Sequence, residues 1–511
     1  MLSCSKTLKA LLISAVLVLA LGLPALAAPN KDTLTVVIRD DIGTFDPHDN
    51  IGFAHHQATR QTFETLVIRN ENMELIPWLA ESWNYEDEET LIFKIRKGVK
   101  FHNGEELKAS DVLFSMKRMR EDNTTAAMQV SQVDFDRSAV IDDYTVKVVT
   151  DGPFAMQLAM FENPLSGIIN EKAYKESGGN FSKAPIGTGP YKLVSQHAGD
   201  RIVFKANENY WRPGEPHIPN LIIRIITESS SRAIEAESGG ADIVYDIVAS
   251  DVDRLRTMPN LTLMSKAGAN TSYICFNVAQ KPLDDIRVRE AVWYAVDVPS
   301  AIKIAYGNFG ILGDGILSPG IEGRHPDLKP LLVKRDVKKA KELLAEAGYP
   351  NGLELRICTE NSNQQRMDFC EVIQAQLAEA GITLKLEFME VNSWLQYMYN
   401  GKAQMSVFGF TASTGEAGRV LSRVLEGYTS EWQLFSYTDP EFRQLVVDGL
   451  KTIDQEKRYE LFYKAQEKMI KDRIALPIWS KEINAAVQNY VKGFALMPSF
   501  EQHYLQFVYF E

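Results

Sequence analysis

The stretch from residue 336 to residue 426 constrains the fold most, because its apolar residues follow first a helical and then a strand spacing, and do so repeatedly. Apolar residues recur at helical spacing over 337–347 and again over 369–380. After each of these segments they alternate instead, over 353–357 and 382–388. A strand, a helix and a strand in this order form a parallel crossover unit. The pattern therefore predicts an α/β fold.

A nearly continuous apolar run at residues 405–410 predicts one more buried parallel strand. Ligands of open parallel sheets bind outside the carboxyl ends of the strands, which is where residues 411–415 fall. Ser413 and Glu416 fit a capping box that opens a helix, and Gly427 closes that helix. These residues could cap the helix and also lie at a ligand site. The N-terminus of a helix that faces a cleft presents free N–H groups and a partial positive charge, which suit a carboxylate of the ligand.

The N-terminal half shows the same arrangement on a smaller scale. Residues 34–38 have strand spacing and lead into a loop at 41–46. Residues 241–245 form a second short strand pattern that leads into a loop at Asp246. We expect loops at the strand exits of two different lobes to face each other across a cleft.

The first residues read as an export signal. Lys6 and Lys9 precede an apolar run at 11–21, and Ala25 to Ala27 offer the small-x-small pattern of a cleavage site. We predict a signal peptide over 1–27; an uncleaved anchor is the alternative, but the run is shorter than the roughly 20 residues of a spanning helix. Cys4 precedes the apolar run, so it cannot be the cysteine of a lipoprotein cleavage site.

Length and charge narrow the class of protein further. The mature chain of about 480 residues exceeds what one hydrophobic core usually organises, so two or more lobes are expected. A net charge of −12 argues against nucleic acid or an anionic membrane as the main partner.

Cys275, Cys358 and Cys370 permit at most one internal disulfide and match no zinc spacing, so they are predicted to be buried small hydrophobes.

The motifs of common enzymes are missing from the sequence. It has no G-x-S-x-G elbow, no H-E-x-x-H helix and no phosphate loop ending in Gly-Lys-Ser/Thr. Residues 186–191 are glycine-rich but contain Pro190, which favours a tight structural turn. His48, His55 and His56 could bind a metal or a metal chelate, but solvated histidines on a polar loop are the favoured interpretation. We therefore predict no enzyme activity, no metal site and no cofactor.

Several segments resemble the peptide/nickel class of extracytoplasmic solute-binding proteins known as family 5. Their order and spacing over almost the whole mature chain make the set specific. The segments are 79–83, 93–104, 109–115, 186–192, 207–214, 276–277, 287–291 and 340–348.

The resemblance implies a two-lobed periplasmic binding protein fold of type II, in its large form, with a hinge of two crossing strands. Lobe I would combine 29–68, 185–275 and 483–511, with an inserted subdomain at 69–184. Lobe II would span 276–482. The protein would be a periplasmic monomer that captures a peptide or peptide-like solute (a dipeptide, an oligopeptide or glutathione) by lobe closure. It would deliver the solute to the transmembrane subunits of an ABC permease with separate cytoplasmic ATPases.

The resemblance also narrows the solute. Dipeptide-binding members use an aspartate and an arginine where this sequence has Ser413 and Glu360, which argues against an ordinary dipeptide held at both ends. Residues 413–417 resemble the S-T-G-E-A loop of glutathione-binding members, and 277–282 is similar to that branch. Glutathione or a short modified peptide is the first choice. The alternatives are a nickel chelate, an opine, a sugar or haem, and, outside transport, a periplasmic hydrolase, a sensory receptor or a chaperone.

The candidate ligand-binding residues lie at the predicted strand exits or are aromatic groups for the cleft wall. Glu360 and Glu416 would face either a cationic group of the ligand or solvent and an intramolecular Lys or Arg. For each aromatic residue, core packing is the competing interpretation. The full set is Phe45, Tyr273, Asn277, Glu360, Trp394, Phe410, Thr411, Ser413, Thr414 and Glu416.

Overall fold

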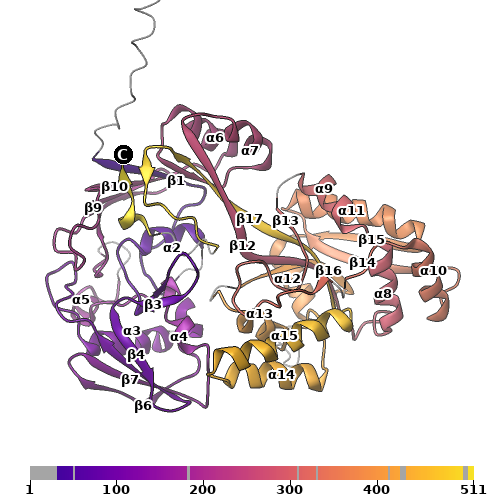
Figure 1. Cartoon of the computed structure of the whole chain (residues 1–511), viewed down its shortest axis with the longest axis horizontal. Coiled ribbons are helices and arrows are strands. Elements are labelled where there is room, and N and C mark those ends of the chain that lie inside the picture. The colour runs from indigo at the N-terminus through magenta and orange to yellow at the C-terminus, as the bar shows by residue number, and fades with distance from the viewer. Residues whose placement is uncertain are drawn as a thin grey trace, which may run out of the picture.

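A computed structural model of the chain shows two bodies side by side, joined by long strands (Figure 1). The predicted signal peptide lies outside the described residues. The structure describes residues 32–49, 52–122, 124–180, 185–307, 310–329, 332–412, 415–425, 433–498 and 504–511.

A single eleven-stranded sheet runs through both bodies, in the order β15-β14-β16-β12-β17-β11-β1-β10-β9-β8 with β13 on β17. The part built on β1 and β8 to β11 is called the first lobe. In it β1 lies between β10 and β11 and is parallel to both, which confirms the predicted strands at 34–38 and 241–245. The elements of the first lobe are β1 Thr33–Ile38, α2 Phe53–Thr59, β8 Tyr191–His197, β9 Arg201–Ala206, β10 Asn220–Ile225, α6 Ser229–Ser238, β11 Ile243–Tyr245, α7 Ala249–Arg256, β18 Val491–Lys492, the 3-10 helix Leu505–Phe507 and β19 Tyr509–Phe510.

The second lobe is built on β14, β15 and β16, which are mutually parallel where they pair. Strand β14, helix α11 and strand β15 form the predicted crossover unit, so that prediction is confirmed. The elements are α8 Ile286–Ala295, α9 Val298–Tyr306, β13 Ile311–Leu312, α10 Val337–Glu346, β14 Leu353–Glu360, α11 Gln364–Glu379, β15 Ile382–Met389, α12 Val391–Tyr399, β16 Met405–Thr411, α13 Ala417–Leu425, α14 Pro440–Lys451 and α15 Gln455–Lys471.

Two long antiparallel strands, β12 Leu261–Phe276 and β17 Ala475–Gln488, cross from one lobe to the other (Figure 1). The C-terminal part of β12 pairs with β16 of the second lobe, whereas the C-terminal part of β17 pairs with β11 of the first lobe. The register between them shifts between Ala267 and Thr271 and again between Ser272 and Tyr273. Bulges bend a strand and interrupt its ladder, so these shifts mark the place where the connection can hinge.

A separate four-stranded sheet, in the order β4-β5-β7-β6, forms the inserted subdomain below the first lobe (Figure 1). Lys94 is exposed on β5 between buried neighbours, as the alternating sequence predicts. The elements are β2 Val67–Arg69, β3 Leu75–Pro77, β4 Ala80–Tyr85, β5 Thr90–Ile95, α3 Ala109–Glu121, the 3-10 helix Thr125–Val130, β6 Val133–Asp142, β7 Thr145–Thr150, α4 Gln157–Met160, the 3-10 helix Pro164–Ser166 and α5 Glu171–Glu176.

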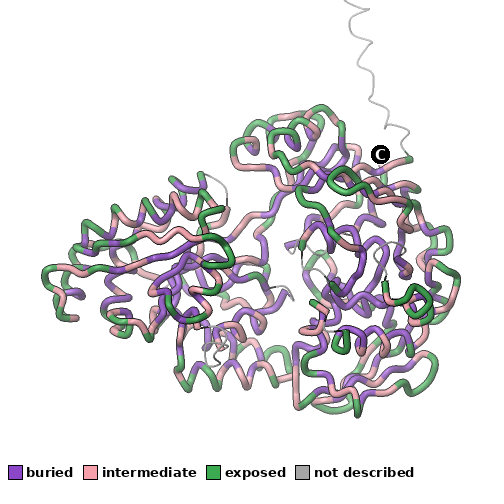
Figure 2. Tube along the Cα trace, turned by 180° about the vertical axis from the view of Figure 1, so that it is seen from behind, coloured by how far each residue is buried: buried purple, intermediate pink, exposed green. Residues whose placement is uncertain are grey.

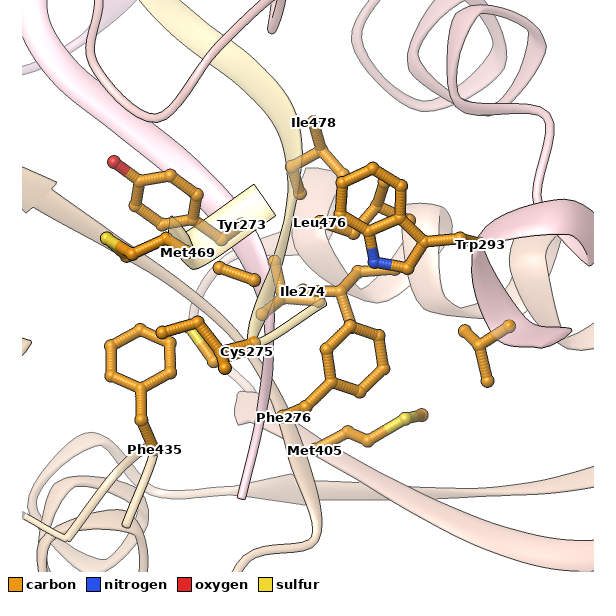
Figure 3. Close-up of a cluster of buried hydrophobic side chains, with 14 of the residues drawn as sticks. Tyr273, Ile274, Cys275, Phe276, Trp293, Met405, Phe435, Met469, Leu476 and Ile478 are labelled. Carbon is orange, nitrogen blue, oxygen red and sulfur yellow. The ribbon is translucent and has the colours of Figure 1, made fainter. Parts of the chain in front are cut away.

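The main hydrophobic cores follow this division. One lies in the second lobe between residues 269 and 479, another in the inserted subdomain between residues 66 and 168, and the first lobe has its own. Figure 2 shows buried residues in the interior of both bodies and exposed residues on their outer surfaces. In the second lobe, Ile274 and Phe276 of β12 pack among Trp293, Met405 and Leu476 (Figure 3). The exact boundaries given from the sequence, 29–68, 69–184, 185–275, 276–482 and 483–511, stay a prediction.

Two of the family-like segments, 186–192 and 207–214, meet at one buried carboxylate, Glu64. Thr188 and Tyr210 each donate a hydroxyl hydrogen bond to it at 2.7 Å. The indole N–H groups of Trp78 and Trp211 donate to it as well, at 2.7 Å and at 3.2 to 3.3 Å. Burial raises the pKa of the Glu64 carboxyl, and the four donors oppose that rise. Segments 186–192 and 207–214 are thus structural partners of one side chain.

The glycines at 187 and 189 are explained by close backbone packing. A Cβ atom at Gly187 would lie 2.0 Å from the carbonyl oxygen of Thr62. A Cβ atom at Gly189 would lie 2.5 Å from the carbonyl oxygen of Gln61. No side chain fits at these distances, so this segment is a structural turn, as predicted.

The three neighbouring histidines are buried, so the prediction that they are solvated is wrong. His48, His55 and His56 are at most 1% exposed. His48 donates from Nε2 to the carbonyl of Gly167 at 2.9 Å, and its Nδ1 accepts from Arg118 at 2.9 Å. The sequence did not show that Asp46 and Arg118 would cover this loop with an ion pair at 2.6 Å. The polar residues of the loop therefore suggested exposed histidines, although the fold buries them.

The cysteines agree with their predicted state. Cys275, Cys358 and Cys370 are free and buried in the second lobe. Burial raises the pKa of all three thiols, which keeps them protonated and unreactive at neutral pH.

Candidate functional site: the cleft between the lobes

A cavity of about 520 Å³ lies beside the two crossing strands and is lined by both lobes. The carboxyl ends of β1, β11 and β16 supply Arg39, Asp246 and Thr411. Asn363 and Arg366 come from the segment that follows β14. The cavity is therefore at the position where open parallel sheets bind ligands, and here two such sheet ends face each other.

Charged side chains dominate the chemistry of this cavity. Four cationic and two anionic groups line it, so its lining is positive although the whole chain is acidic. A cavity with both signs of charge can hold the two ends of a zwitterion, and the cationic excess favours a net anionic one. The six groups are Arg39, Arg232, Asp246, Arg366, Lys481 and Glu482.

The first-lobe wall is built around Arg232, which α6 holds with 2% of its surface exposed. Its guanidinium donates to the carbonyls of Ile226, Thr227 and Asp246, each at 2.9 Å. Burial lowers the pKa of Arg232. These bonds fix the backbone at the exit of β11, where Asp246 has a φ of 56°. Such a left-handed conformation is uncommon outside glycine and points to a constrained functional position.

The crossing strand β17 forms the floor of the cavity. Lys481 lies 3.5 Å from the Asp246 carboxylate, so the hinge strand and the first lobe make an ion pair at the cavity wall. Trp479 stacks against Tyr306 of α9, with ring centroids 4.6 Å apart. An aromatic face beside charged groups suits the apolar parts of a small polar solute.

The second-lobe wall is the first turn of α11. Asn363 caps this helix by accepting from the N–H of Arg366 at 3.1 Å. Arg366 pairs with Glu360 at 2.8 Å, and both side chains are largely shielded, with 18% and 17% exposed. The guanidinium also lies over the ring of Trp394, 5.5 Å from its centroid. Arg366 is thereby held at the cavity by a carboxylate on one side and an indole on another.

Of the predicted ligand residues, Thr411 lines the cavity and Glu360 lies one contact behind it. Thr411 accepts from the side-chain amide of Asn270 at 3.0 Å. Arg366 is thus the intramolecular partner that the sequence analysis gave as one of two alternatives for Glu360. Ser413 and Thr414 lie outside the described residues. Direct contact of these residues with ligand stays a prediction.

The aromatic candidates are packed into cores. Phe45 lies in the first-lobe core, 6.0 Å from the ring of Phe204. Tyr273 donates its hydroxyl to the carbonyl of Ile316, and its ring lies 6.2 Å from that of Phe410. These three aromatic side chains are at most 8% exposed, so they shape the lobes from within.

Trp394 and Asn277 are also tied to their own lobe. Trp394 donates from its indole to Ser406 at 3.1 Å and is 3% exposed. Asn277 donates to the carbonyl of Gly401 at 3.1 Å and is 2% exposed. Trp394 still contacts Arg366, so it supports the cavity wall without lining it.

Glu416 pairs with Arg458 at 2.6 Å, and the two side chains are 4% and 9% exposed. It lines a second cavity of about 510 Å³, together with Glu74 and Tyr85 of the inserted subdomain. Glu416 therefore faces the boundary between the inserted subdomain and the second lobe, and it has the intramolecular partner that the sequence allowed.

Sequence reasoning missed Arg366, Arg232 and Lys481. Arg366 was missed because the apolar periodicity of α11 begins at Phe369, while the helix begins five residues earlier at Gln364. Asn363 is a helix cap by residue type, and that signal could have placed Arg366 in the first turn. Arg232 carried no local signal, because its role depends on the distant exit of β11.

No group of His, Cys, Asp or Glu able to hold a metal ion occurs among the described residues. In the same part of the chain, no helix combines the length and the apolar character needed to cross a bilayer.

Two α/β lobes, two crossing strands and a charged cavity at facing sheet ends define a two-lobed solute-binding protein of the periplasmic type. The family model described as bacterial extracellular solute-binding proteins, family 5 Middle, matches residues 74–431. The chain belongs to this family.

Relatives and solved structures agree with this assignment. The glutathione-binding protein GsiB of Escherichia coli K12 is 28% identical over 502 residues, which cover 96% of this chain and 97% of the relative. HbpA2 from Haemophilus parasuis has a TM-score of 0.86 and 25% identity, covering 94% of this chain and all of that one. DppA from Helicobacter pylori in complex with the peptide STSA has a TM-score of 0.76 and 26% identity, covering 94% and 98%.

Proposed function

We propose that this solute-binding protein captures a short, net anionic peptide-like solute in the periplasm, with glutathione as the first candidate. It then delivers the solute to the transmembrane subunits of an ABC permease, whose separate ATPases drive import. The observation that carries the choice of solute is the charge of the cavity, with four cationic and two anionic side chains at the facing sheet ends.

The chemistry of glutathione matches this lining. The tripeptide has two carboxylates and one ammonium group, so its net charge is negative at neutral pH. Its carboxylates would accept charge-assisted hydrogen bonds from Arg366 and Lys481, while its ammonium would meet Asp246. An ordinary dipeptide has one group of each sign and would use the cationic excess less well. The relationship to a glutathione-binding protein in Escherichia coli supports the same choice.

Capture needs no covalent step. Each lobe presents part of the site, and hinge bending at the bulges of β12 brings the parts together. Closure is favoured by the extra affinity that the solute has for the closed form. A micromolar ligand contributes about 8 kcal/mol in total, enough to shift a hinge equilibrium by several powers of ten.

Thermal unfolding against a panel of solutes tests the proposal. The panel contains reduced and oxidised glutathione, a neutral dipeptide, a dilysine peptide, an opine and a nickel chelate. We expect glutathione to raise the unfolding midpoint, because ligand at a hundredfold excess over its dissociation constant stabilises the native state by about 2.7 kcal/mol. Preferential stabilisation by dilysine or by the nickel chelate would contradict the choice of solute.

The same samples separate binding from catalysis. After saturation, we expect mass spectrometry to recover the solute intact from the protein. A hydrolase would instead release products with repeated turnover. Recovery of intact solute at unchanged amount over hours is the result that supports a binding protein.

A further inference from the structure

An ion pair joins the inserted subdomain to the second lobe. Arg69, the last residue of β2, donates from Nη1 to Oε2 of Glu322 at 2.8 Å. Arg69 belongs to the inserted subdomain, whose core begins at Leu66, and Glu322 belongs to the second lobe. The contact therefore exists while the two bodies are together.

The arginine is held in place by its own side of the interface. Its side chain is fully buried, its Nη1 also donates to the carbonyl of Met73, and Glu162 lies 4.0 Å away. Burial works against the charged form, but Glu322 and then Glu162 outweigh it, so the pKa of Arg69 is raised. Separation of the lobes would leave Arg69 with Met73 and Glu162 but without Glu322.

The glutamate is tied to the loop that follows β16. The backbone N–H of Glu322 donates to the carbonyl of Gly415 at 2.9 Å, and the N–H of Ala417 donates to the carbonyl of Glu322 at 2.8 Å. These two bonds form a parallel bridge between Glu322 and the segment containing Glu416. Glu322 is therefore bonded through its backbone to residues 415–417, which lead into α13.

Arg69 also contacts that loop directly. A Cβ atom at Gly415 would lie 3.1 Å from Nε of Arg69 and 3.1 Å from Cε of Met73. Gly415 has a φ of 70°, a left-handed conformation that glycine adopts without strain. The close approach and the missing side chain let the loop lie against the arginine of the opposite body.

We propose that Arg69 and Glu322 form a clasp that sets the balance between the open and closed forms and couples it to the loop after β16. The inference rests on the lobe closure of the proposed function, but not on the identity of the solute. A second contact, the N–H of Ala155 to the carbonyl of Leu450 at 2.8 Å, joins the same two bodies through backbone atoms. Side-chain substitution leaves that contact in place, so the clasp can be tested by itself.

The test measures lobe separation in the solute-free protein. Spin labels replace Lys205 on β9 and Lys338 on α10, which are exposed residues of opposite lobes. Pulsed electron resonance then gives the distance distribution. Glu322→Gln keeps the shape of the side chain but removes its charge. We assign the charged hydrogen bond to the closed form alone, so its loss is expected to shift the ratio of open to closed protein toward the open form by about tenfold or more.

The matched control is Glu235→Gln. Glu235 pairs with Arg224 at 2.7 Å and is 24% exposed, close to the 25% of Glu322, but both partners lie in the first lobe. We expect the control to leave the distance distribution unchanged. Equal distributions for wild type, Glu322→Gln and Glu235→Gln would overturn the proposal.

A second readout separates the clasp from the solute assignment. With glutathione as the probe, Glu322→Gln is expected to weaken binding several-fold while the control does not. If no protein variant binds glutathione, the proposed solute fails, and the solute-free distances still decide about the clasp. If glutathione binds equally to all variants and the distances are unchanged, the clasp fails while the proposed function stands.

Discussion

Arg458 donates from Nε to Oε1 of Glu416 at 2.6 Å, inside the second lobe and almost entirely away from solvent. Burial raises the pKa of the Glu416 carboxyl, and Arg458 opposes this rise. Glu416 directly precedes α13 and Arg458 lies on α15, so their bond fixes the start of α13 beside the boundary between the second lobe and the inserted subdomain.

Removing one partner of this pair is expected to destabilise the protein strongly. Glu416→Leu or Arg458→Leu alone leaves an uncompensated buried charge, which costs about 3–5 kcal/mol of unfolding free energy. The double variant should lose much less than the sum, because it removes both charges. Urea unfolding of the four proteins gives the coupling energy. If the losses of unfolding free energy in the two single variants instead add up in the double variant, and if Glu416→Leu but not Arg458→Leu loses solute binding, Glu416 contacts the solute.

Much of the second lobe could be predicted because its helices and strands have strong periodic patterns. Strands β14, β15 and β16 and helix α10 lie within a few residues of the ranges read from the sequence. Parallel order followed from a physical rule about crossover connections, and this rule needs no distant contacts. The position of β16 itself also agrees with the sequence, while contact of the loop that follows it with ligand stays a prediction.

The walls of the cavity were harder to predict, because they depend on residues far apart in the sequence. Arg232 acts through the carbonyl of Asp246 and Lys481 through its carboxylate, and neither pairing leaves a local pattern. The aromatic candidates show the opposite problem. Tyr273 and Phe410 lie in apolar runs of β12 and β16, and such a run does not tell which face of a sheet meets a cleft and which meets a core.

Arg366 is expected to contribute directly to solute affinity. Arg366→Gln removes a charge-assisted hydrogen bond worth about 1.5–3 kcal/mol, which corresponds to roughly a 10- to 150-fold weaker binding of glutathione. Titration calorimetry measures the change. Arg335→Gln is the matched control, because Arg335 pairs with Glu379 at 2.9 Å in the same lobe but does not line the cavity. Equal losses in both variants would show that the effect comes from the lobe and not from the site.

Glu360→Gln provides the complementary test at the same wall. It releases Arg366 from its carboxylate partner, so the guanidinium becomes fully available to an anionic solute. We therefore expect glutathione affinity to stay the same or to rise. A large fall in affinity, measured by the same calorimetry, would indicate that Glu360 itself receives a cationic group of the solute.

The Glu64 network is expected to be one of the most sensitive structural positions. Glu64→Leu leaves four donors without their acceptor, three of them buried, and each unsatisfied buried donor costs about 1–3 kcal/mol. We expect a loss of at least about 3 kcal/mol in the unfolding free energy. Thr188→Val removes one donor and should cost about 1–2 kcal/mol. Similar losses from both variants in urea unfolding would show that Glu64 is not the common acceptor.

The buried histidines give the protein a defined sensitivity to acid. Burial, followed by the positive charge of Arg118, lowers the pKa of His48 from 6.5 to about 4, and burial likewise lowers that of His55 to about 4. In the unfolded chain these groups bind protons below pH 6.5, whereas in the native protein they stay neutral until about pH 4. The unfolded state thus binds more protons in this window, so stability falls as the pH drops from 6.5 to 4.

For His48 alone the loss amounts to about 3 kcal/mol across that window. We expect His48→Gln to be less stable than wild type at pH 7.5, because the flexible amide must place its donor and its acceptor where the rigid ring holds Nε2 against Gly167 and Nδ1 against Arg118. Its unfolding free energy should, however, decline less between pH 7.5 and pH 5 than that of wild type, since glutamine does not titrate. Urea unfolding at three pH values measures both slopes, and a nuclear magnetic resonance titration showing His48 protonated near pH 6.5 would contradict the burial argument.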